Sequence, residues 1–308
     1  MRSDADAKGV DRHEPGRDLD ADRSLVSVVV PTRNSQRYLT QCLGSIRAQT
    51  YRPLEIIVVD NFSIDSTPDI GIRLADKVYQ AGPERSAQVN FGARAARGLY
   101  VFRVDSDFRL DRCVIAECVD LCKSGAGAVV VHNTPDDTVG LLARVRKFEV
   151  DMYKFSPDHT AARFTTRETY LAIGGLREDL VAGEDYDFQN RLNKVGVLTL
   201  TATSEAVHLD EPTRLLPLLR KYFDYGRDFR NYRRYNRHES WRQLAFLRHD
   251  YLRNWRKFIR EPGIGALFVG YHTVKFIAGG IGYGVGVAEL WVNGRCAVTA
   301  PERSGPKP

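Results

Sequence analysis

Two carboxylates one residue apart are the first candidates for chemistry in this chain of 308 residues. Asp105 and Asp107 follow the apolar run 101–104, which we predict to be a buried strand, so that residues i and i+2 point to the same side. Neighbouring carboxylates repel each other unless a cation lies between them, and Mg²⁺ or Mn²⁺ is often shared with a phosphate. The pair indicates a metal–diphosphate site, with a solvated Asp-Ser-Asp turn as the alternative.

Polar side chains also follow two earlier apolar runs, 25–30 and 54–59, which we predict to be buried strands. These side chains belong to Thr32, Arg33, Asn34, Asp60 and Asn61. In an open α/β sheet, ligands bind beyond the carboxyl ends of the strands, at one shared edge. This convergence strengthens the prediction of a diphosphate site.

The segments between these runs have helical spacing or a second strand pattern. We predict helices over 35–48, from Ser63 onward and over 84–97, with shorter strands at 77–80 and 197–202. The repeated β-α-β order predicts an α/β fold with a doubly wound, mainly parallel sheet. Neither Gly-x-Gly-x-x-Gly nor Gly-x-x-x-x-Gly-Lys-Ser/Thr occurs, which disfavours a dinucleotide-binding Rossmann domain and a P-loop.

Sequence blocks spread over residues 25–196 resemble family 2 glycosyltransferases of the GT-A fold. The blocks are Val-Ser-Val-Val-Val-Pro-Thr-Arg-Asn from residue 26, Asp-Asn-Phe-Ser-Ile-Asp from 60, Val-Asp-Ser-Asp from 104, Gly-Gly-Leu from 174 and Gly-Glu-Asp-Tyr-Asp from 183. The resemblance implies inverting, metal-dependent transfer of a sugar from a nucleotide diphosphate sugar. It implies a glycan, glycolipid or polyprenyl-linked acceptor in cell-envelope or polysaccharide biosynthesis.

The resemblance also implies the residues of the donor site. Those expected to bind the nucleotide sugar are Pro31, Thr32, Arg33, Asp60, Asn61, Arg85, Asp105, Ser106, Asp107 and Glu184. Asp60 and Asn61 would meet the nucleobase. The donor is expected to be UDP- or GDP-linked, and Asn61, where relatives often have a second Asp, leaves the choice between the two bases open. The expected cofactor is Mn²⁺ or Mg²⁺, bound by Asp107 with Asp105, and by His208 beyond the strand predicted at 197–202.

The acidic block 184–187 precedes a helix with Phe188, Leu192 and Val195 on its apolar face. Acidic residues in a first helical turn interact favourably with the helix dipole, which is one explanation of the block. The resemblance favours another, in which Asp185 is the catalytic base that takes the proton from the acceptor hydroxyl.

The cysteines and the N-terminus predict the compartment. The five cysteines include no Cys-x-x-Cys pair, which favours reduced thiols in a cytoplasmic protein. Residues 1–23 are polar and lack the apolar core of a signal peptide, so we expect a disordered tail.

The C-terminal third is basic and then apolar. Residues 214–260 contain fourteen Lys/Arg and four Asp/Glu, interleaved with aromatic residues. This pattern suits binding to nucleic acid or to an anionic membrane surface. A sugar transferase domain next to it favours the membrane, and we expect no nucleic-acid partner. In the glycine-rich segment 263–292, the longest uncharged piece is 276–288, shorter than the roughly 20 residues of a membrane span. We predict a re-entrant or surface-lying hairpin with glycines suited to close helix packing, or else a helical cap over the acceptor cleft.

Four segments therefore make up the expected organisation. They are a disordered tail (1–23), a GT-A domain (24–212), a helical membrane-associating region (213–300) and a loose tail (301–308). The protein is expected at the cytoplasmic face of the membrane, bound peripherally through residues 213–292. The alternatives are a nucleotidyltransferase of similar fold and a non-catalytic lipid- or nucleic-acid-binding protein.

Overall fold

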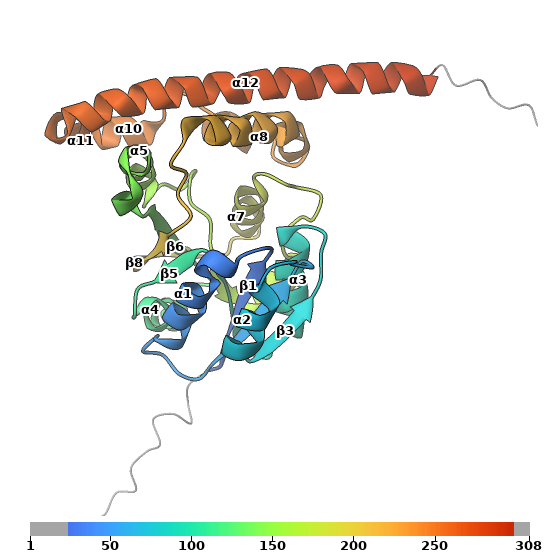
Figure 1. Cartoon of the computed structure of the whole chain (residues 1–308), viewed down its shortest axis with the longest axis vertical. Coiled ribbons are helices and arrows are strands. Elements are labelled where there is room, and N and C mark those ends of the chain that lie inside the picture. Colours follow the sequence, from blue (N-terminus) through green and yellow to red (C-terminus); the bar gives the residue numbers. More distant parts are fainter. Residues whose placement is uncertain (1–23, 299–308) are drawn as a thin grey trace, which may run out of the picture.

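The computed structural model in Figure 1 describes residues 24–298, with side chains to residue 289. It consists of an α/β part and a layer of helices at one end of it (Figure 1). The predicted tails, 1–23 and 301–308, lie outside the described residues, as does the side chain of Cys296. The four cysteines whose side chains are described are free thiols.

The described chain contains one eight-stranded mixed sheet of order β3-β2-β1-β4-β7-β6-β8-β5. Its strands are β1 (Val26–Thr32), β2 (Leu54–Asp60), β3 (Lys77–Gln80), β4 (Tyr100–Arg103), β5 (Phe108–Leu110), β6 (Ala128–Pro135), β7 (Phe164–Thr166) and β8 (Thr199–His208). The first four strands are parallel, as predicted. Strands β5 and β7 pair antiparallel to their neighbours, and β5, β6 and β7 were not predicted.

Helices cover both faces of this sheet. They are α1 (Gln36–Arg47), α2 (Thr67–Leu74), α3 (Arg85–Ala95), α4 (Val114–Lys123), α6 (Arg167–Ala172) and α7 (Glu184–Lys194). Alternate residues of a strand face opposite sides. Val28 of β1 accordingly packs in the core cluster that contains α1 and α4, and Val29 packs in the cluster that contains α3 and α7.

The prediction that Asp105 and Asp107 end a strand is wrong. Strand β4 ends at Arg103, and the two carboxylates lie in the turn between β4 and β5. The turn is closed by the Phe108 N–H, which donates to the Asp105 carbonyl at 3.1 Å. The argument from strand alternation therefore does not apply, and side-chain partners decide where each carboxylate points.

The helical layer is built mainly from the C-terminal third. It contains α5 (Leu141–Val150) between the short 3₁₀ turns Asp137–Val139 and Asp151–Tyr153, then α8 (Leu215–Tyr235), α9 (Glu239–Gln243), α10 (His249–Arg253), α11 (Trp255–Arg260) and α12 (Pro262–Val298). The predicted hairpin is wrong, because α12 is one continuous helix of 37 residues. It lies across the end of the molecule, alongside α8 (Figure 1).

Glycines let α8 and α12 approach closely. A Cβ on Gly282 would lie 2.8 Å from the Phe223 carbonyl carbon, and one on Gly286 would lie 2.5 Å from the Arg227 carbonyl oxygen. By contrast, a Cβ on Gly280 or Gly284 would meet nothing within 4 Å. The predicted close packing thus holds for the glycines on the α8 side and not for those on the outer side.

A buried ion pair explains why charge in the apolar segment does not interrupt α12. The Lys275 ammonium contacts Glu149 of α5, which also accepts a 2.9 Å hydrogen bond from the Tyr153 hydroxyl. Burial raises the pKa of Glu149, but Lys275, His272 and Arg248 together outweigh this effect and hold that pKa well below its usual range. Lys275 therefore faces inward, and the exposed residues of α12 between 262 and 288 include no charged side chain.

Candidate active site

Asp105 lies between two guanidinium groups. Its Oδ1 accepts from Arg85 at 2.9 Å and its Oδ2 accepts from Arg163 at 3.0 Å. Burial raises the pKa of Asp105, but the two arginines outweigh it and hold the pKa well below its usual range. In the described structure, Arg85 and Arg163 therefore supply the positive charge that this carboxylate needs.

Asp185, in the first turn of α7, faces the same arginines. Its Oδ1 accepts from Arg103, and its Oδ2 lies 3.6 Å from Arg85 and 3.8 Å from Arg163. Burial raises the pKa of Asp185, but Arg103 and then Arg85 and Arg163 lower it well below its usual range. Asp185 is therefore ionised at neutral pH.

Glu184 completes a cluster of three carboxylates and three guanidinium groups. It accepts from Arg85, the first residue of α3, while burial and the neighbouring charge of Asp185 raise its pKa. The Arg85 side chain is 39% exposed, against 4% for Arg103 and 10% for Arg163. Arg85 is therefore the guanidinium of this cluster that a ligand can reach most readily.

Asp107 is paired with His208. Strand β5 places Phe108 opposite His208 of β8, which brings His208 Nε2 within 3.1 Å of Asp107 Oδ2. His208 Nδ1 contacts Glu211. Burial lowers the pKa of His208, but hydrogen bonds to Asp107 and Glu211 outweigh it and raise the pKa to about 9. His208 is the last residue of β8, which is longer than the predicted strand 197–202.

The donor set at this point suits a metal that is only partly held by protein. A carboxylate oxygen and an imidazole nitrogen lie side by side at Asp107 and His208. Among the described residues, no group of three or more His, Cys, Asp or Glu side chains forms a complete metal site. Mg²⁺ commonly keeps one or two carboxylates and takes its remaining ligands from water and substrate phosphates. The two residues fit such a shared ion better than a structural metal.

The predicted nucleobase residues have strong local roles. Asp60 is fully buried, and its carboxylate accepts from the Thr32 hydroxyl at 2.9 Å and from the Ser63 N–H at 2.8 Å. Asn61 donates through Nδ2 to the Pro83 carbonyl at 2.6 Å. These bonds fix the loops after β1, β2 and β3 to one another.

The remaining predicted residues lie at the same strand ends. Pro31 is buried within β1, and Arg33 is exposed just beyond it. Ser106 donates from its hydroxyl to that of Ser35 at 2.9 Å, which ties the turn after β4 to the start of α1. The structure thus brings the predicted residues to one edge of the sheet.

Asp187 anchors α7 from the side away from Asp185. It is buried and accepts from Arg191 at 2.8 Å and from Asn236 of the helical layer at 2.9 Å. Residues i and i+2 of a helix face different directions, so the acidic block divides into an anchor and a group that faces the arginines. The expectation that Val195 belongs to the apolar face is wrong, since it is 63% exposed.

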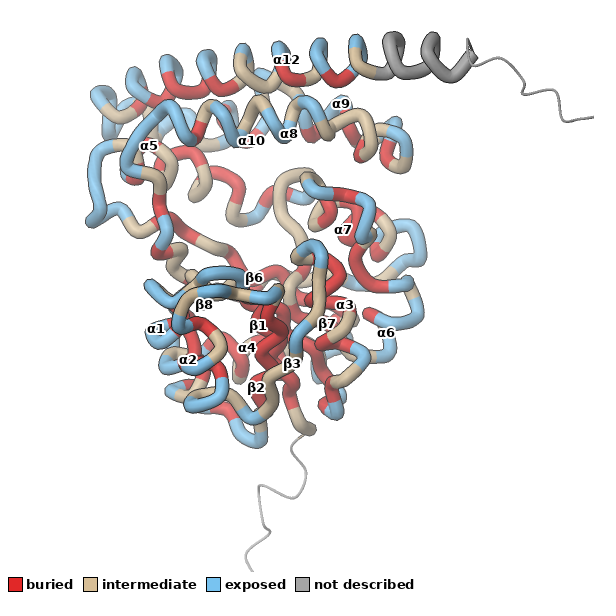
Figure 2. Tube along the Cα trace, turned by 45° about the vertical axis from the view of Figure 1, so that its right-hand side comes forward, coloured by how far each residue is buried: buried red, intermediate tan, exposed pale blue. Residues whose placement is uncertain are grey.

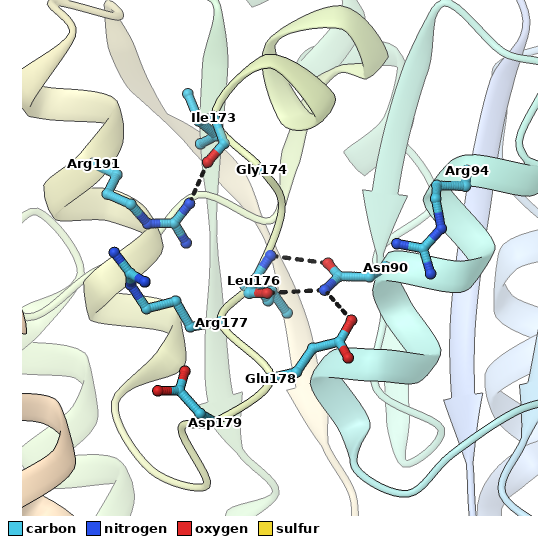
Figure 3. A pocket seen from close by; sticks show the side chains of 9 residues that line it. All are labelled: Asn90, Arg94, Ile173, Gly174, Leu176, Arg177, Glu178, Asp179 and Arg191. Carbon is cyan, nitrogen blue, oxygen red and sulfur yellow. Dashed lines mark hydrogen bonds between the residues drawn. The ribbon is translucent and has the colours of Figure 1, made fainter.

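Asn90 of α3 holds the Gly-Gly-Leu block. It accepts from the Leu176 N–H at 2.9 Å and donates to the Leu176 carbonyl at 2.8 Å and to Glu178 at 2.9 Å (Figure 3). Arg191 of α7 donates to the Gly175 carbonyl at 2.6 Å. The hollow seen here is lined by none of the predicted site residues, so the block positions α7 rather than forming the donor site.

Sequence reasoning missed Arg103, Arg163 and Glu211. Arg103 carried a signal, because a charged residue inside the apolar run 101–104 must find a buried partner. Its Nη2 donates to the Ala162 carbonyl at 2.8 Å. Arg163 and Glu211 come next to their partners only through the folding of β7 and β8.

The fold and these side chains define a GT-A glycosyltransferase domain. Mannosyltransferase PcManGT from Pyrobaculum calidifontis, in complex with GDP-Man and Mn²⁺, has the same fold, with a TM-score of 0.53 and 19% identity over 92% of this chain and 83% of that one. Glycosyltransferase GlyG of Streptococcus pneumoniae is 39% identical over 90 residues, 27% of this chain and 30% of GlyG. Chondroitin synthase of Escherichia coli is 25% identical over 189 residues, 56% of this chain and 27% of the synthase.

Residues 27–177 match the sequence profile described as Glycosyl transferase family 2. The chain belongs to glycosyltransferase family 2. Its aligned part spans less than a third of the length of GlyG and of chondroitin synthase.

Proposed function

We propose that this protein is an inverting, metal-dependent glycosyltransferase that uses a UDP- or GDP-linked sugar. One observation carries the proposal: the guanidinium of Arg85 contacts both Asp105, in the turn after β4, and Asp185, at the start of α7. The candidate diphosphate-binding turn and the candidate base therefore adjoin each other. The family assignment favours this function over nucleotidyl transfer or a purely binding role.

The donor would lie along the strand ends. Its nucleoside would meet Pro31, Thr32, Arg33, Asp60 and Asn61. Its diphosphate would recruit Arg85, because this side chain is more exposed than its two neighbours and a guanidinium suits phosphate oxygens. Asp107 and His208, with Asp105 beside them, would hold Mg²⁺ or Mn²⁺. When bound, the metal supplies positive charge that stabilises the departing nucleotide diphosphate. His208 would have to lose its proton first, so metal affinity falls as the solution becomes more acidic.

Asp185 would take the proton of the acceptor hydroxyl. Its low pKa makes it a weak base while Arg85, Arg103 and Arg163 all face it. Transfer of Arg85 to the donor diphosphate removes part of that positive field and raises the pKa of Asp185 toward its usual range. Arg103 stays buried against Asp185 and keeps the carboxylate in place. A positioned general base contributes about 10²- to 10⁴-fold to a rate.

A panel of nucleotide sugars with and without Mn²⁺ or Mg²⁺ tests the donor site. We expect slow metal-dependent hydrolysis of a UDP- or GDP-sugar, lost in Asp107→Asn, and no metal-dependent binding of any donor would contradict the proposal. Asp185→Asn should bind the donor and lose transfer by about 10²-fold or more. Asp120→Asn removes an exposed carboxylate from α4 and serves as the matched control. Full transfer by Asp185→Asn would remove Asp185 as the base.

We further propose that α12 lies on a membrane surface, which suits a glycolipid or polyprenyl-linked acceptor. Within the described residues, Pro262–Glu289 is long and apolar enough to span a bilayer. The exposed residues between 262 and 288 include no Asp, Glu, Lys or Arg, and the side of α12 away from α8 is the exposed one (Figure 2). Glycines of α12 lie against the backbone of α8, which is rich in arginine. If α12 spanned the bilayer, it would therefore draw those arginines into the hydrocarbon. An orientation in the plane of the interface avoids this cost.

Flotation with anionic vesicles tests the membrane contact. The unmodified protein should float at low salt, and Ile277→Glu/Ile281→Glu should float less, since both side chains are more than half exposed on the outer face. Leu171→Glu, on a helix of the α/β part, is the control. Equal flotation of all three proteins would refute the contact through α12.

A further inference from the structure

Four arginines gather at the C-terminal end of α8. They are Arg230, Arg233, Arg234 and Arg237. Together with Asn231 of α8 and Tyr283 of α12, they line a hollow of about 580 Å³. Among the side chains that the structure describes, none of the four forms an ion pair, although the chain has ion pairs elsewhere on its surface. Four like charges at close quarters repel one another unless an anion joins them.

Two of these arginines are held in place. Arg230 donates to the Gly286 carbonyl at 3.0 Å and Arg233 donates to the Tyr283 hydroxyl at 2.9 Å, so both are fixed against α12. Arg234 and Arg237 are exposed, and among the described residues neither guanidinium contacts a carbonyl or a carboxylate. The hollow therefore has two preorganised guanidinium groups and two that are free to close on a ligand.

The neighbouring acidic side chains are engaged elsewhere. Asp228 accepts from Asn231 at 2.6 Å and from the Val181 N–H at 3.3 Å. Asp179 accepts from the Tyr235 hydroxyl at 2.6 Å. Both carboxylates serve the contact between α8 and the loop before α7, so neither acts as a counter-charge to the four arginines.

The surroundings indicate a membrane lipid as the source of the anion. Tyr283 belongs to the segment of α12 whose outer side is apolar, and Trp241, at 67% exposed, lies against Arg233 with 4.8 Å between the guanidinium carbon and the ring centre. Tryptophan and arginine beside an apolar helix face suit the depth of lipid headgroups. A guanidinium fork matches the oxygens of a phosphate.

We propose that the hollow formed by Arg230, Arg233, Arg234, Arg237 and Tyr283 binds the phosphate of an anionic membrane lipid. This inference rests on the proposed membrane contact and adds a stoichiometric lipid site to it. The bound phosphate would neutralise the cluster and hold α8 at headgroup level, with the donor site on the side of α8 away from the bilayer.

Calorimetric titration of the full chain with monomeric dihexanoylphosphatidylglycerol tests the site. We expect saturable binding by the unmodified protein and by the control Arg253→Gln/Arg256→Gln, whose two exposed arginines lie outside the hollow. Arg234→Gln/Arg237→Gln should bind about a hundredfold more weakly, since each lost charge-assisted hydrogen bond costs about tenfold. Equal weakening of both double variants would show diffuse attraction to charge and overturn the site.

Further titrations identify the ligand class and test a variant that is expected to fold if the glutamine variant does not. Binding of inorganic phosphate or of dihexanoylphosphatidylcholine as tightly as phosphatidylglycerol would overturn an anionic lipid as the ligand. If the glutamine variant unfolds, Arg234→Lys/Arg237→Lys keeps the charge without the planar fork and should bind several-fold more weakly. Unchanged binding by the lysine variant would then overturn the proposal. Donor hydrolysis by the unmodified protein is measured alongside, so that failure of this site is distinguished from failure of the proposed enzyme activity.

Discussion

Replacement of Gly282 and of Gly284 by alanine should change stability in opposite directions, although the two residues are only two positions apart in α12. A Cβ on Gly284 meets nothing within 4 Å, so alanine there should stabilise the protein by about 0.5–1 kcal/mol through its better helix propensity. A Cβ on Gly282 would lie 2.8 Å from the Phe223 carbonyl carbon and 3.1 Å from the Arg227 nitrogen. The Phe223 carbonyl oxygen would lie closer still, and carbon atoms in contact lie roughly 3.5–4.0 Å apart, so the helices must separate by at least about 1 Å.

That separation has a cost that exceeds the gain in propensity. A gap of about 1 Å forfeits a quarter to a half of the dispersion energy of the atoms that line it, and overpacking in general costs about 1–3 kcal/mol. We therefore expect Gly282→Ala to destabilise the chain by about 1–2 kcal/mol net. Urea unfolding followed by circular dichroism gives both values under identical conditions. If both variants shift the midpoint in the same direction, the close approach of α8 and α12 is not what these glycines serve.

Three further predictions concern charged side chains with fixed partners. Burial raises the pKa of Glu117, but hydrogen bonds from Thr203 and Ser204 lower it to about 2. The stability this carboxylate contributes is therefore complete above its ordinary pKa and is lost as the pH falls toward 2, so Glu117→Gln should lower the melting temperature at pH 7 and hardly at pH 2. Arg103→Met should destabilise the chain by about 1–3 kcal/mol at pH 7, because Asp185 loses its closest cation while Arg85 and Arg163 remain, with a smaller effect in acid where that carboxylate is protonated. Lys275→Met should cost about 3–5 kcal/mol, and adding Glu149→Gln should recover much of the loss in a double-mutant cycle.

The long apolar elements were predictable from the sequence. Strands β1 and β2 are β-branched runs buried on both faces, and α1 shows its apolar stripe at positions such as Leu39 and Leu43. Strands β5 and β7 have three residues each, too few to show an alternating hydrophobic pattern. They form because β5 pairs with β8, and β7 pairs with β4 and β6.

The sequence predicted which residues belong to the candidate site better than it predicted which of them contact one another. The sequence indicates that Asp105 and Asp107 need cations, but not that one takes arginines and the other His208, since that choice depends on β5 pairing with β8. The predicted hairpin fails for a similar reason. Lys275 interrupts the apolar segment in the sequence, yet its partner Glu149 is 126 residues earlier and turns the charge inward.

The start of α7 links the two parts of the molecule in a way that bears on chimeric enzymes. Gly183 has φ near +81°, and a Cβ there would lie 2.7 Å from the ring of Tyr232 in α8. Asn236, just beyond α8, donates to Asp187 in α7. The change of composition near residue 213 is therefore crossed by direct contacts, and a graft of the C-terminal helices onto another transferase would have to bring the matching first turn of α7 with it.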